Sequence, residues 1–131
     1  MTATPTTGTP RSVLVVDDVM VNRRLAVAIF HKLGWQCSEV DGGNAALNWL
    51  RSNPAVDLVL LDIRMPDLNG EEVCRELRSD PAFATLPIVA YTAHAMQMDI
   101  DRFLANGFNE VLIKPISVQG LRDLVTELFP D

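Results

Sequence analysis

The chain has 131 residues, of which 48% are apolar, and a formal net charge of −6 at pH 7. This length suits one domain with one core, and the apolar content excludes a chain that is disordered throughout. A phosphate backbone is held mainly by clustered Lys and Arg, so the acidic balance and the lack of a basic run argue against direct binding of nucleic acid.

The first half of the chain predicts strand, helix, strand and helix in turn. Ser12–Val16 is a continuous apolar run, as expected for a central strand covered on both faces. A helix follows, because apolar residues recur at four-residue intervals, and Gly34 predicts its end. The next strand, Trp35–Val40, is more mixed and suits a sheet edge. The positions that mark the two helices are Val21, Leu25, Ile29 and Leu33, then Ala46, Leu47 and Leu50.

The alternation continues in the second half. Leu58–Leu61 is another continuous apolar run and predicts a second central strand. Pro87 can occupy the first position of a strand over Ile88–Tyr91, and Val111–Ile113 predicts the fifth strand. The apolar positions that mark the last three helices are Gly70, Val73 and Leu77, then Ile100, Phe103 and Leu104, then Leu121, Leu124, Val125 and Leu128.

Five strands alternating with five helices predict an α/β fold, a doubly wound parallel sheet with right-handed crossovers and helices on both faces. Before it, the Thr-, Pro- and Gly-rich start predicts a flexible tail or linker over residues 1–11, without the positive start and apolar run of a signal peptide. Cys37 and Cys74 lie within apolar patterns, which favours small buried thiols over a disulfide. We therefore expect a cytoplasmic protein without a membrane partner.

Four of the predicted strands end at polar residues that phosphoryl chemistry can use. If the strands are parallel, their carboxyl ends lie along one edge of the sheet, where open α/β folds bind ligands. The carboxylates then indicate a bound cation, and the ammonium and hydroxyl groups indicate a bound anion. The residues are Asp17 and Asp18, Asp62, Thr92, and Lys114 with Pro115.

Asp17, Asp18 and Asp62 would place three carboxylates at neighbouring strand ends. Like charges this close cannot all stay ionised cheaply unless a cation lies between them. Hard oxygen ligands with few protein contacts suit Mg²⁺, which keeps several waters and often bridges to a phosphate. The alternative is that the acids cap the first helix and interact with its positive end.

Asp62 ends the most hydrophobic strand and is followed by a loop. Its carboxylate can act as a nucleophile toward a phosphoryl group and form an aspartyl phosphate. Pro66 delays the next helix, and Asn69 and Gly70 supply turn residues, so we expect the loop to hold Asp62 at the surface. We interpret Asp67 in this loop as a turn residue rather than a ligand.

Lys114 supplies a compact positive charge that suits a phosphoryl oxygen. Its bond to Pro115 is of the kind that can be cis. The hydroxyl group of Thr92 could donate to the same phosphoryl group, although a Thr after a strand is also a common helix cap.

These motifs resemble a response-regulator receiver domain, with a match from about Ser12 to Phe129. The resemblance implies a flavodoxin-like strand order of 2-1-3-4-5 and a receiver domain over residues 12–130. The spacing from Asp17 to Asn22 is similar to that of receivers in hybrid sensor kinases and phosphorelays. The matching segments are Val13–Asp18, Leu60–Pro66, Asn69–Gly70, Thr92–Ala93 and Lys114–Ile116.

By this resemblance, Asp62 accepts a phosphoryl group from a phosphohistidine on a histidine kinase or a histidine phosphotransfer protein. Asp18 would contact Mg²⁺ directly and Asp17 mainly through water, while Asp62 and the backbone carbonyl of Arg64 complete the protein ligands. The chain would then be a signalling phosphoacceptor that assists its own phosphorylation and dephosphorylation, and not an enzyme. Its downstream partner is not indicated by the sequence.

The family also implies that Lys114 pairs with the phosphoryl group, that Pro115 follows a cis bond and that Thr92 moves toward the phosphate. One departure is Val111, where receivers usually carry the Phe or Tyr of an aromatic switch. A second concerns Arg64 and His94, at two positions that the family uses to tune the phosphoryl lifetime. These two side chains either shield the phosphate or orient water, or they are exposed and idle.

Three other classes of protein use parts of the same pattern. An aspartyl-nucleophile phosphohydrolase would need a second acid two residues after Asp62, where this chain has Arg64. A flavin mononucleotide binder would need a Ser-, Thr- or Gly-rich loop after the first strand, where Asp17 and Asp18 would repel the phosphate. The third is a receiver-like binding module that acts without phosphorylation, and it remains the alternative function.

Overall fold

The computed structural model of the chain describes residues 10–130. Residues 1–9, which make up most of the tail or linker predicted over residues 1–11, lie outside the described residues. In the described part, no helix is both long enough and apolar enough to cross a membrane. Cys37 is half-buried and Cys74 is buried, and both are free thiols.

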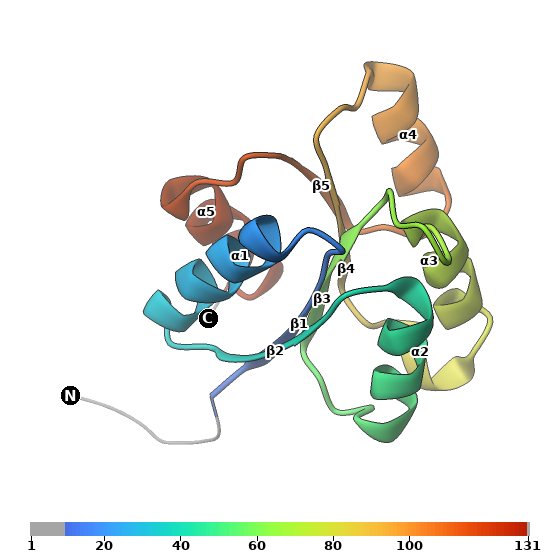
Figure 1. Cartoon of the computed structure of the whole chain (residues 1–131), viewed down its shortest axis with the longest axis horizontal. Coiled ribbons are helices and arrows are strands. Elements are labelled where there is room, and N and C mark those ends of the chain that lie inside the picture. Colours follow the sequence, from blue (N-terminus) through green and yellow to red (C-terminus); the bar gives the residue numbers. More distant parts are fainter. Residues whose placement is uncertain (1–9, 131) are drawn as a thin grey trace.

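One parallel sheet organises the chain, with its strands in the order β2-β1-β3-β4-β5 (Figure 1). All four neighbouring pairs of strands are parallel. This confirms the predicted doubly wound sheet and its flavodoxin-like order. The strands are β1 (Ser12–Val16), β2 (Gln36–Val40), β3 (Leu58–Asp62), β4 (Ile88–Thr92) and β5 (Glu110–Ile113).

Helices cover both faces of the sheet, as predicted. Figure 1 shows α1 and α5 on one face and α2, α3 and α4 on the other. A short 3₁₀ helix, Pro81–Phe83, lies between α3 and β4 and was not predicted. The helices are α1 (Met20–Lys32), α2 (Gly43–Ser52), α3 (Gly70–Arg78), α4 (Gln97–Ala105) and α5 (Val118–Leu128).

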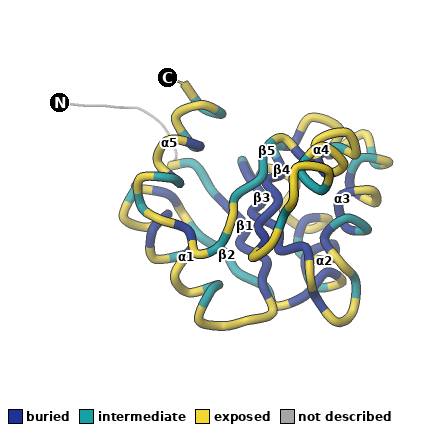
Figure 2. Tube along the Cα trace, turned by 90° about the horizontal axis from the view of Figure 1, so that it is seen from above, coloured by how far each residue is buried: buried dark blue, intermediate teal, exposed yellow. Residues whose placement is uncertain are grey.

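Each face of the sheet has its own hydrophobic core, because successive side chains of a strand point to opposite sides. In β1, Val13 and Val15 pack with Phe30 of α1, whereas Leu14 and Val16 join the core beneath α2, α3 and α4. The three central strands are therefore buried on both faces (Figure 2), which explains their continuous apolar sequences.

The four-residue spacing that marks α1 in the sequence does not describe the face that this helix buries. Val21 is 72% exposed and Leu25 is 41% exposed, whereas Ala26, Ile29 and Phe30 are buried. An α-helix has 3.6 residues per turn, so a strict spacing of four drifts around the helix axis. The helix itself was predicted correctly, but Val21 and Leu25, two of the four apolar positions that marked it, face solvent.

Candidate functional site

The loops after four strands enclose a hollow of about 310 Å³ at the carboxyl edge of the sheet. β1, β3, β4 and β5 end at this edge, since all of them run in the same direction. Asp62, Thr92 and Lys114, which come from β3, β4 and the residue after β5, all line the hollow, together with the exposed Asp18. Side chains more than fifty residues apart are brought into one site in this way.

The three carboxylates among the predicted metal ligands form one acidic cluster. Asp17, Asp18 and Asp62 each offer an oxygen atom, and these oxygens all lie within 4.8 Å of one another. Asp17 is fully buried and Asp62 is 3% exposed, so the expectation that the loop holds Asp62 at the surface is wrong. Because Asp62 is the last residue of β3, paired with Tyr91 of β4, it lies at the floor of the hollow.

Asp17 has one satisfied carboxylate oxygen and one that lacks a hydrogen-bond donor. Oδ1 accepts the backbone N–H of Val19 at 2.9 Å. Oδ2 is buried and accepts no hydrogen bond from the described residues, although Lys114 Nζ lies 3.1 Å away at ion-pair distance. A buried carboxylate oxygen without a donor is costly unless a cation compensates it. The Lys114 ammonium is shared with Asp62 and compensates the charge only in part, so the arrangement fits a bound metal ion better than a simple cap. Helix α1 itself begins without a side-chain cap.

Lys114 is held over the cluster by contacts on several sides. Its Nζ donates to Asp62 Oδ1 at 3.2 Å and lies 4.5 Å from the centre of the Tyr91 ring. Its backbone N–H donates to the Thr92 carbonyl oxygen at 2.8 Å, and its peptide bond to Pro115 is cis. The ammonium group thus occupies a defined position beside Asp62, with only 13% of the side chain exposed.

The charge balance of the site changes the acidity of Asp62. Burial and the neighbouring charge of Asp17 raise the pKa of Asp62 from 3.8 to about 7, and Lys114 opposes this only in part. One ammonium faces three carboxylates, so the cluster retains excess negative charge. Hard oxygen donors with excess negative charge are what a divalent cation such as Mg²⁺ prefers, and the donor set fits this ion.

A capping box fixes the end of the loop between Asp62 and α3. Asn69 Oδ1 accepts the backbone N–H of Glu72 at 2.9 Å, and Glu72 Oε1 accepts that of Asn69 at 3.1 Å. Gly70 donates its N–H to the Ile63 carbonyl oxygen at 2.8 Å, and a Cβ atom on Gly70 would collide with the Asp62 carbonyl oxygen. The sequence contains the capping-box signal, an Asn followed three residues later by Glu, but our interpretation as simple turn residues missed it.

Of the remaining predicted side chains, those of Thr92, Arg64 and His94 line the hollow, whereas Val111 lies against the core. Thr92 is buried, and its hydroxyl group donates to the His94 carbonyl oxygen at 3.1 Å. It does not cap α4, which begins at Gln97. The side chains of Arg64 and His94 are exposed and both line the hollow. Val111 pairs with Ala90 and packs against the core beneath α2, α3 and α4.

Arg23 supports the site but was not predicted. Its Nη1 donates to the backbone carbonyl oxygen of Asp17 at 3.0 Å, and its Nε donates to Glu39 at 2.7 Å. The side chain is 14% exposed, so it packs between α1 and β2 while it holds the end of β1. A lone Arg on a predicted helix gave no signal for this role, because a helical pattern shows neither that its side chain reaches back to Asp17 nor that Glu39 of β2 lies beside it.

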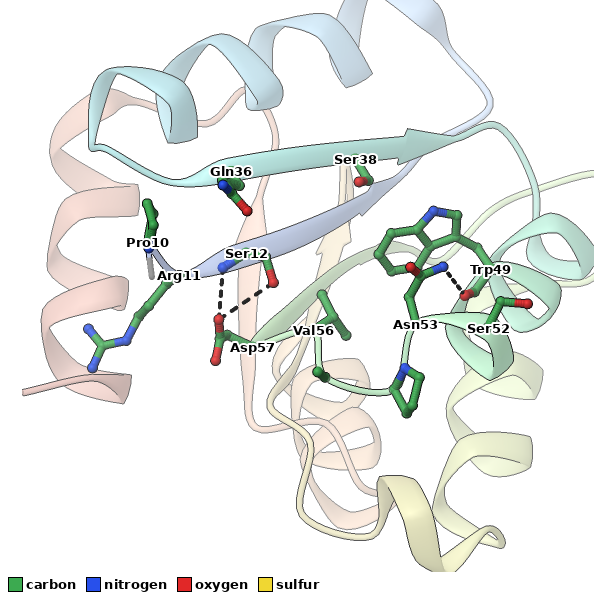
Figure 3. Close-up of a pocket in the computed structure, with 12 residues that line it drawn as sticks. Pro10, Arg11, Ser12, Gln36, Ser38, Trp49, Ser52, Asn53, Val56 and Asp57 are labelled. Carbon is green, nitrogen blue, oxygen red and sulfur yellow. Dashed lines mark hydrogen bonds between the residues drawn. The ribbon is translucent and has the colours of Figure 1, made fainter. Parts of the chain in front are cut away.

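A larger hollow, of about 830 Å³, lies at the other end of the sheet between β2 and the end of α2 (Figure 3). Its one acidic lining residue is Asp57, whose Oδ2 accepts the backbone N–H of Ser12 at 2.8 Å and so links the starts of β1 and β3. Gln36, Ser38 and Trp49 also line it. No cluster of reactive groups accompanies this space within the described residues, so size alone does not identify the functional site.

The fold and the site together define a class of protein, the flavodoxin-like α/β domains that carry an aspartate cluster and a lysine at the carboxyl edge of the sheet. Within this class, the chain belongs to the response regulator receiver domain family, whose family model matches residues 13–126. It is thus a receiver domain of two-component systems.

Similar sequences occur in sensor kinases and in response regulators. Sensor histidine kinase RcsC of Salmonella typhi is 38% identical over 110 residues, which cover 84% of this chain and 11% of that protein. Sensor histidine kinase GacS of Pseudomonas protegens is 39% identical over 116 residues, or 86% of this chain and 12% of that protein. The chain thus spans about a tenth of these kinases, but 84% of the rice two-component response regulator ORR11, to which it is 28% identical.

Solved receiver structures superimpose closely on this chain. The receiver domain of sensor histidine kinase PA1611 from Pseudomonas aeruginosa PAO1 has a TM-score of 0.80 and 30% identity, covering 94% of this chain and all of that one. That structure has a magnesium ion coordinated in its active site cleft. A putative response regulator from Chloroflexus aurantiacus has a TM-score of 0.87 and 25% identity, with the same coverage.

Proposed function

We propose that this chain is a phosphoacceptor in two-component signal transduction, and that Asp62 takes a phosphoryl group from a phosphohistidine. The observation that carries the proposal is the placement of the Asp62 carboxylate at the floor of the hollow, 3.2 Å from the Lys114 ammonium and beside two further carboxylates. The phosphodonor partner is a histidine kinase or a histidine phosphotransfer protein, in keeping with the sensor kinases that contain similar sequences.

Mg²⁺ is the proposed cofactor. Asp17, Asp18, Asp62 and the backbone carbonyl of Arg64 would hold it, and the donor-free buried oxygen of Asp17 supports this ligand set. When bound, the ion supplies positive charge against the incoming phosphoryl group. The magnesium ion in the related PA1611 receiver is a further support.

In the proposed transfer, a carboxylate oxygen of Asp62 attacks the phosphorus atom and forms an O–P bond. The N–P bond to the imidazole of the donor breaks, and its electron pair returns to the ring nitrogen. Lys114 meets a phosphoryl oxygen with its ammonium group, which already lies beside Asp62. The products are an aspartyl phosphate and a free histidine, so the chain is a phosphoacceptor that assists its own phosphorylation and dephosphorylation rather than an enzyme acting on separate substrates.

Phosphorylation would replace the single negative charge of the Asp62 carboxylate with a phosphoryl group that carries roughly −1.5 to −2 charges. The Thr92 hydroxyl group, which donates to the His94 carbonyl oxygen, can rotate and donate to the phosphate instead. Loss of the bond to His94 would then loosen the loop before α4. Val111 has no ring to follow that movement, so we propose that backbone displacement of this loop carries the change to a downstream partner. Arg64 and His94 line the entrance and are the proposed determinants of the phosphoryl lifetime.

The domain would extend over residues 12–130, with residues 1–11 as a tail or linker. We also propose a cytoplasmic location, because the two free cysteines suit a reducing compartment. Direct binding of nucleic acid or membrane is not part of the proposal, since the chain carries a net charge of −6.

The test is incubation of the protein with Mg²⁺ and acetyl phosphate, followed by mass spectrometry of the intact chain. The wild type should gain one phosphoryl group, and Asp62→Asn should gain none, because the amide lacks the nucleophilic oxygen. An unmodified wild type, or equal gain in both proteins, would contradict the proposal. The first outcome would favour the alternative, a receiver-like binding module that acts without phosphorylation.

A further inference from the structure

The loop after Asp62 is fastened to the neighbouring helix α2 through the side chain of Asp67. Asp67 Oδ1 accepts the backbone N–H of Gly43 at 3.1 Å, and Oδ2 accepts that of Asn44 at 3.0 Å. Helix α2 has no side-chain cap of its own, because its N-cap residue is Gly42. Asp67 therefore supplies from another loop the cap that Gly42 cannot provide, and it is more than the turn residue that we predicted.

The glycine pair at the start of α2 allows this contact. A Cβ atom on Gly42 would lie 3.1 Å from both carboxylate oxygens of Asp67, and one on Gly43 would collide with the backbone and side chain of Leu68. Neither glycine has a positive φ, so close approach rather than backbone conformation explains both of them. The sequence of α2 is thus adapted to receive the loop that follows β3.

Asp67 is exposed, so burial contributes little to this contact, and electrostatic attraction and hydrogen bonds hold it. A carboxylate at the N-terminus of a helix interacts favourably with the partial positive charge of the unpaired N–H groups. The backbone N–H of Asn44, followed by that of Gly43, lowers the pKa of Asp67. Asp67 therefore acts through directed hydrogen bonds rather than through packing.

The segment that Asp67 holds contains a proposed metal ligand. Its C-terminal end is fixed by the Asn69 capping box, and the carbonyl of Arg64 lies between that end and Asp62. On the other side, the strand that leads to α2 meets the metal cluster, since the Asp17 N–H donates to the Val40 carbonyl oxygen at 3.3 Å. Asp67 thus joins the two loops that lie on either side of Asp17.

We propose that Asp67 is a positioning residue: by capping α2, it holds the loop over residues 63–69 in the geometry in which the Arg64 carbonyl and Asp62 bind Mg²⁺. This role deepens the proposed function and rests on it. Binding free energies are reciprocal, so bound Mg²⁺ should in turn strengthen the contact between Asp67 and α2.

The first test compares the Mg²⁺ affinities of matched variants by isothermal titration calorimetry. Asp80→Ala is the control, because Asp80 also caps a helix, the 3₁₀ helix Pro81–Phe83, by accepting the Ala82 N–H at 3.0 Å. We expect Asp67→Ala to weaken Mg²⁺ binding by about fivefold or more, and Asp80→Ala to leave it unchanged. Asp67→Asn keeps one acceptor oxygen, so its Mg²⁺ affinity should lie between those of the two alanine variants. Equal affinities for Asp67→Ala and Asp80→Ala would overturn the role.

The second test uses the unaltered chain. Mg²⁺ should slow hydrogen exchange of the Gly43 and Asn44 amides, measured by NMR, and leave that of the Ala82 amide as it was. Unchanged exchange at the Gly43 and Asn44 amides would overturn the proposal. This outcome does not depend on whether Asp67→Ala folds, because only the wild type is measured. Phosphorylation of the wild type by acetyl phosphate is recorded in parallel: a wild type that binds Mg²⁺ but gains no phosphoryl group contradicts the proposed function, whereas the two tests above judge Asp67 alone.

Discussion

The ammonium group of Lys114 donates a 3.2 Å hydrogen bond to the carboxylate of Asp62, a residue that precedes it by 52 positions. The same nitrogen lies 3.1 Å from Asp17, so one cation serves two buried carboxylates. This pairing leaves an excess of negative charge, because one ammonium group faces the three carboxylates of Asp17, Asp18 and Asp62. The excess negative charge favours a bound cation at this site.

Without metal, the stability of the domain should fall as the pH rises from about 4 to about 7. Burial and the charge of Asp17 raise the pKa of Asp62 to about 7, whereas the carboxyl group of the unfolded chain titrates near its ordinary value. Between these values the folded protein holds a proton that the unfolded chain has released, so rising pH favours unfolding. We expect a loss of roughly 2–4 kcal/mol in the free energy of unfolding, measured by urea denaturation in EDTA.

Asp62→Asn provides the control for this pH dependence. The amide does not titrate, so the variant should lose much less stability over the same range of pH. Excess Mg²⁺ should restore stability to the wild type near neutral pH, because the ion binds the deprotonated carboxylate. Parallel stability curves for the wild type and Asp62→Asn in EDTA would show that the Asp62 carboxyl group is not the one responsible.

Replacing Lys114 should harm both the fold and the phosphoryl transfer. Lys114→Met removes the counter-charge of Asp17 and Asp62, and we expect a loss of about 1–3 kcal/mol at pH 8 in EDTA. Transfer from acetyl phosphate should slow by about tenfold or more, since the incoming oxygens lose a positive partner. Lys32→Met, at an exposed position in the last turn of α1, is the matched control and should behave as the wild type. Equal transfer rates in the two variants would show that Lys114 does not contribute to phosphoryl transfer.

Gly70→Ala should destabilise the protein although alanine is the better helix former. A Cβ atom at Gly70 would collide with the carbonyl oxygen of Asp62 and the backbone of Ile63, and neither can move without disturbing the phosphoacceptor loop. The expected cost is about 1–3 kcal/mol in urea denaturation. Gly120→Ala in α5 would meet only the Ser117 hydroxyl group and should change stability by less than about 1 kcal/mol. An unchanged free energy of unfolding in Gly70→Ala would show that the phosphoacceptor loop can rearrange at little cost.

Two adjacent arginines on α1, Arg23 and Arg24, should contribute differently to the stability of the fold. Arg23 bonds both Glu39 and the Asp17 carbonyl oxygen with 14% of its side chain exposed, whereas Arg24 bonds Glu39 with 64% of its side chain exposed. We expect Arg23→Ala to cost about 1–2 kcal/mol and Arg24→Ala less than about 0.5 kcal/mol in chemical denaturation. Equal losses would show that the Asp17 carbonyl bond contributes nothing measurable.

The fold could be predicted because its signals are local and strong. Continuous apolar runs such as Leu58–Leu61 mark strands that are buried on both faces, and glycine at position 34, where φ is +90°, marks the end of α1. The least accurate part was the buried face of α1, where Val21 and Leu25 are exposed. Apolar spacing indicates that a helix forms, but which side meets the sheet depends on partners that lie far away in sequence.

The candidate site was predictable for a related reason. Asp62, Thr92 and Lys114 stand at the ends of predicted strands, and parallel strands bring such positions to one edge whatever their separation along the chain. The supporting contacts were not predictable in this way. Asp67 bonds to the backbone at the start of α2, and Arg23 bonds to Glu39 of β2, and no local pattern shows that these segments lie side by side.

The amino-acid sequence by itself determined the alternating elements, the parallel sheet and the set of reactive groups at its carboxyl edge, because all of these depend on periodicity and chain direction. Only the tertiary structure decided that Asp62 lies buried at the floor of the hollow, that one lysine serves two carboxylates and that Asp67 caps α2 across two loops. Burial, charge balance and hydrogen bonding are properties of neighbours in space, so they appear only when segments distant in sequence come together.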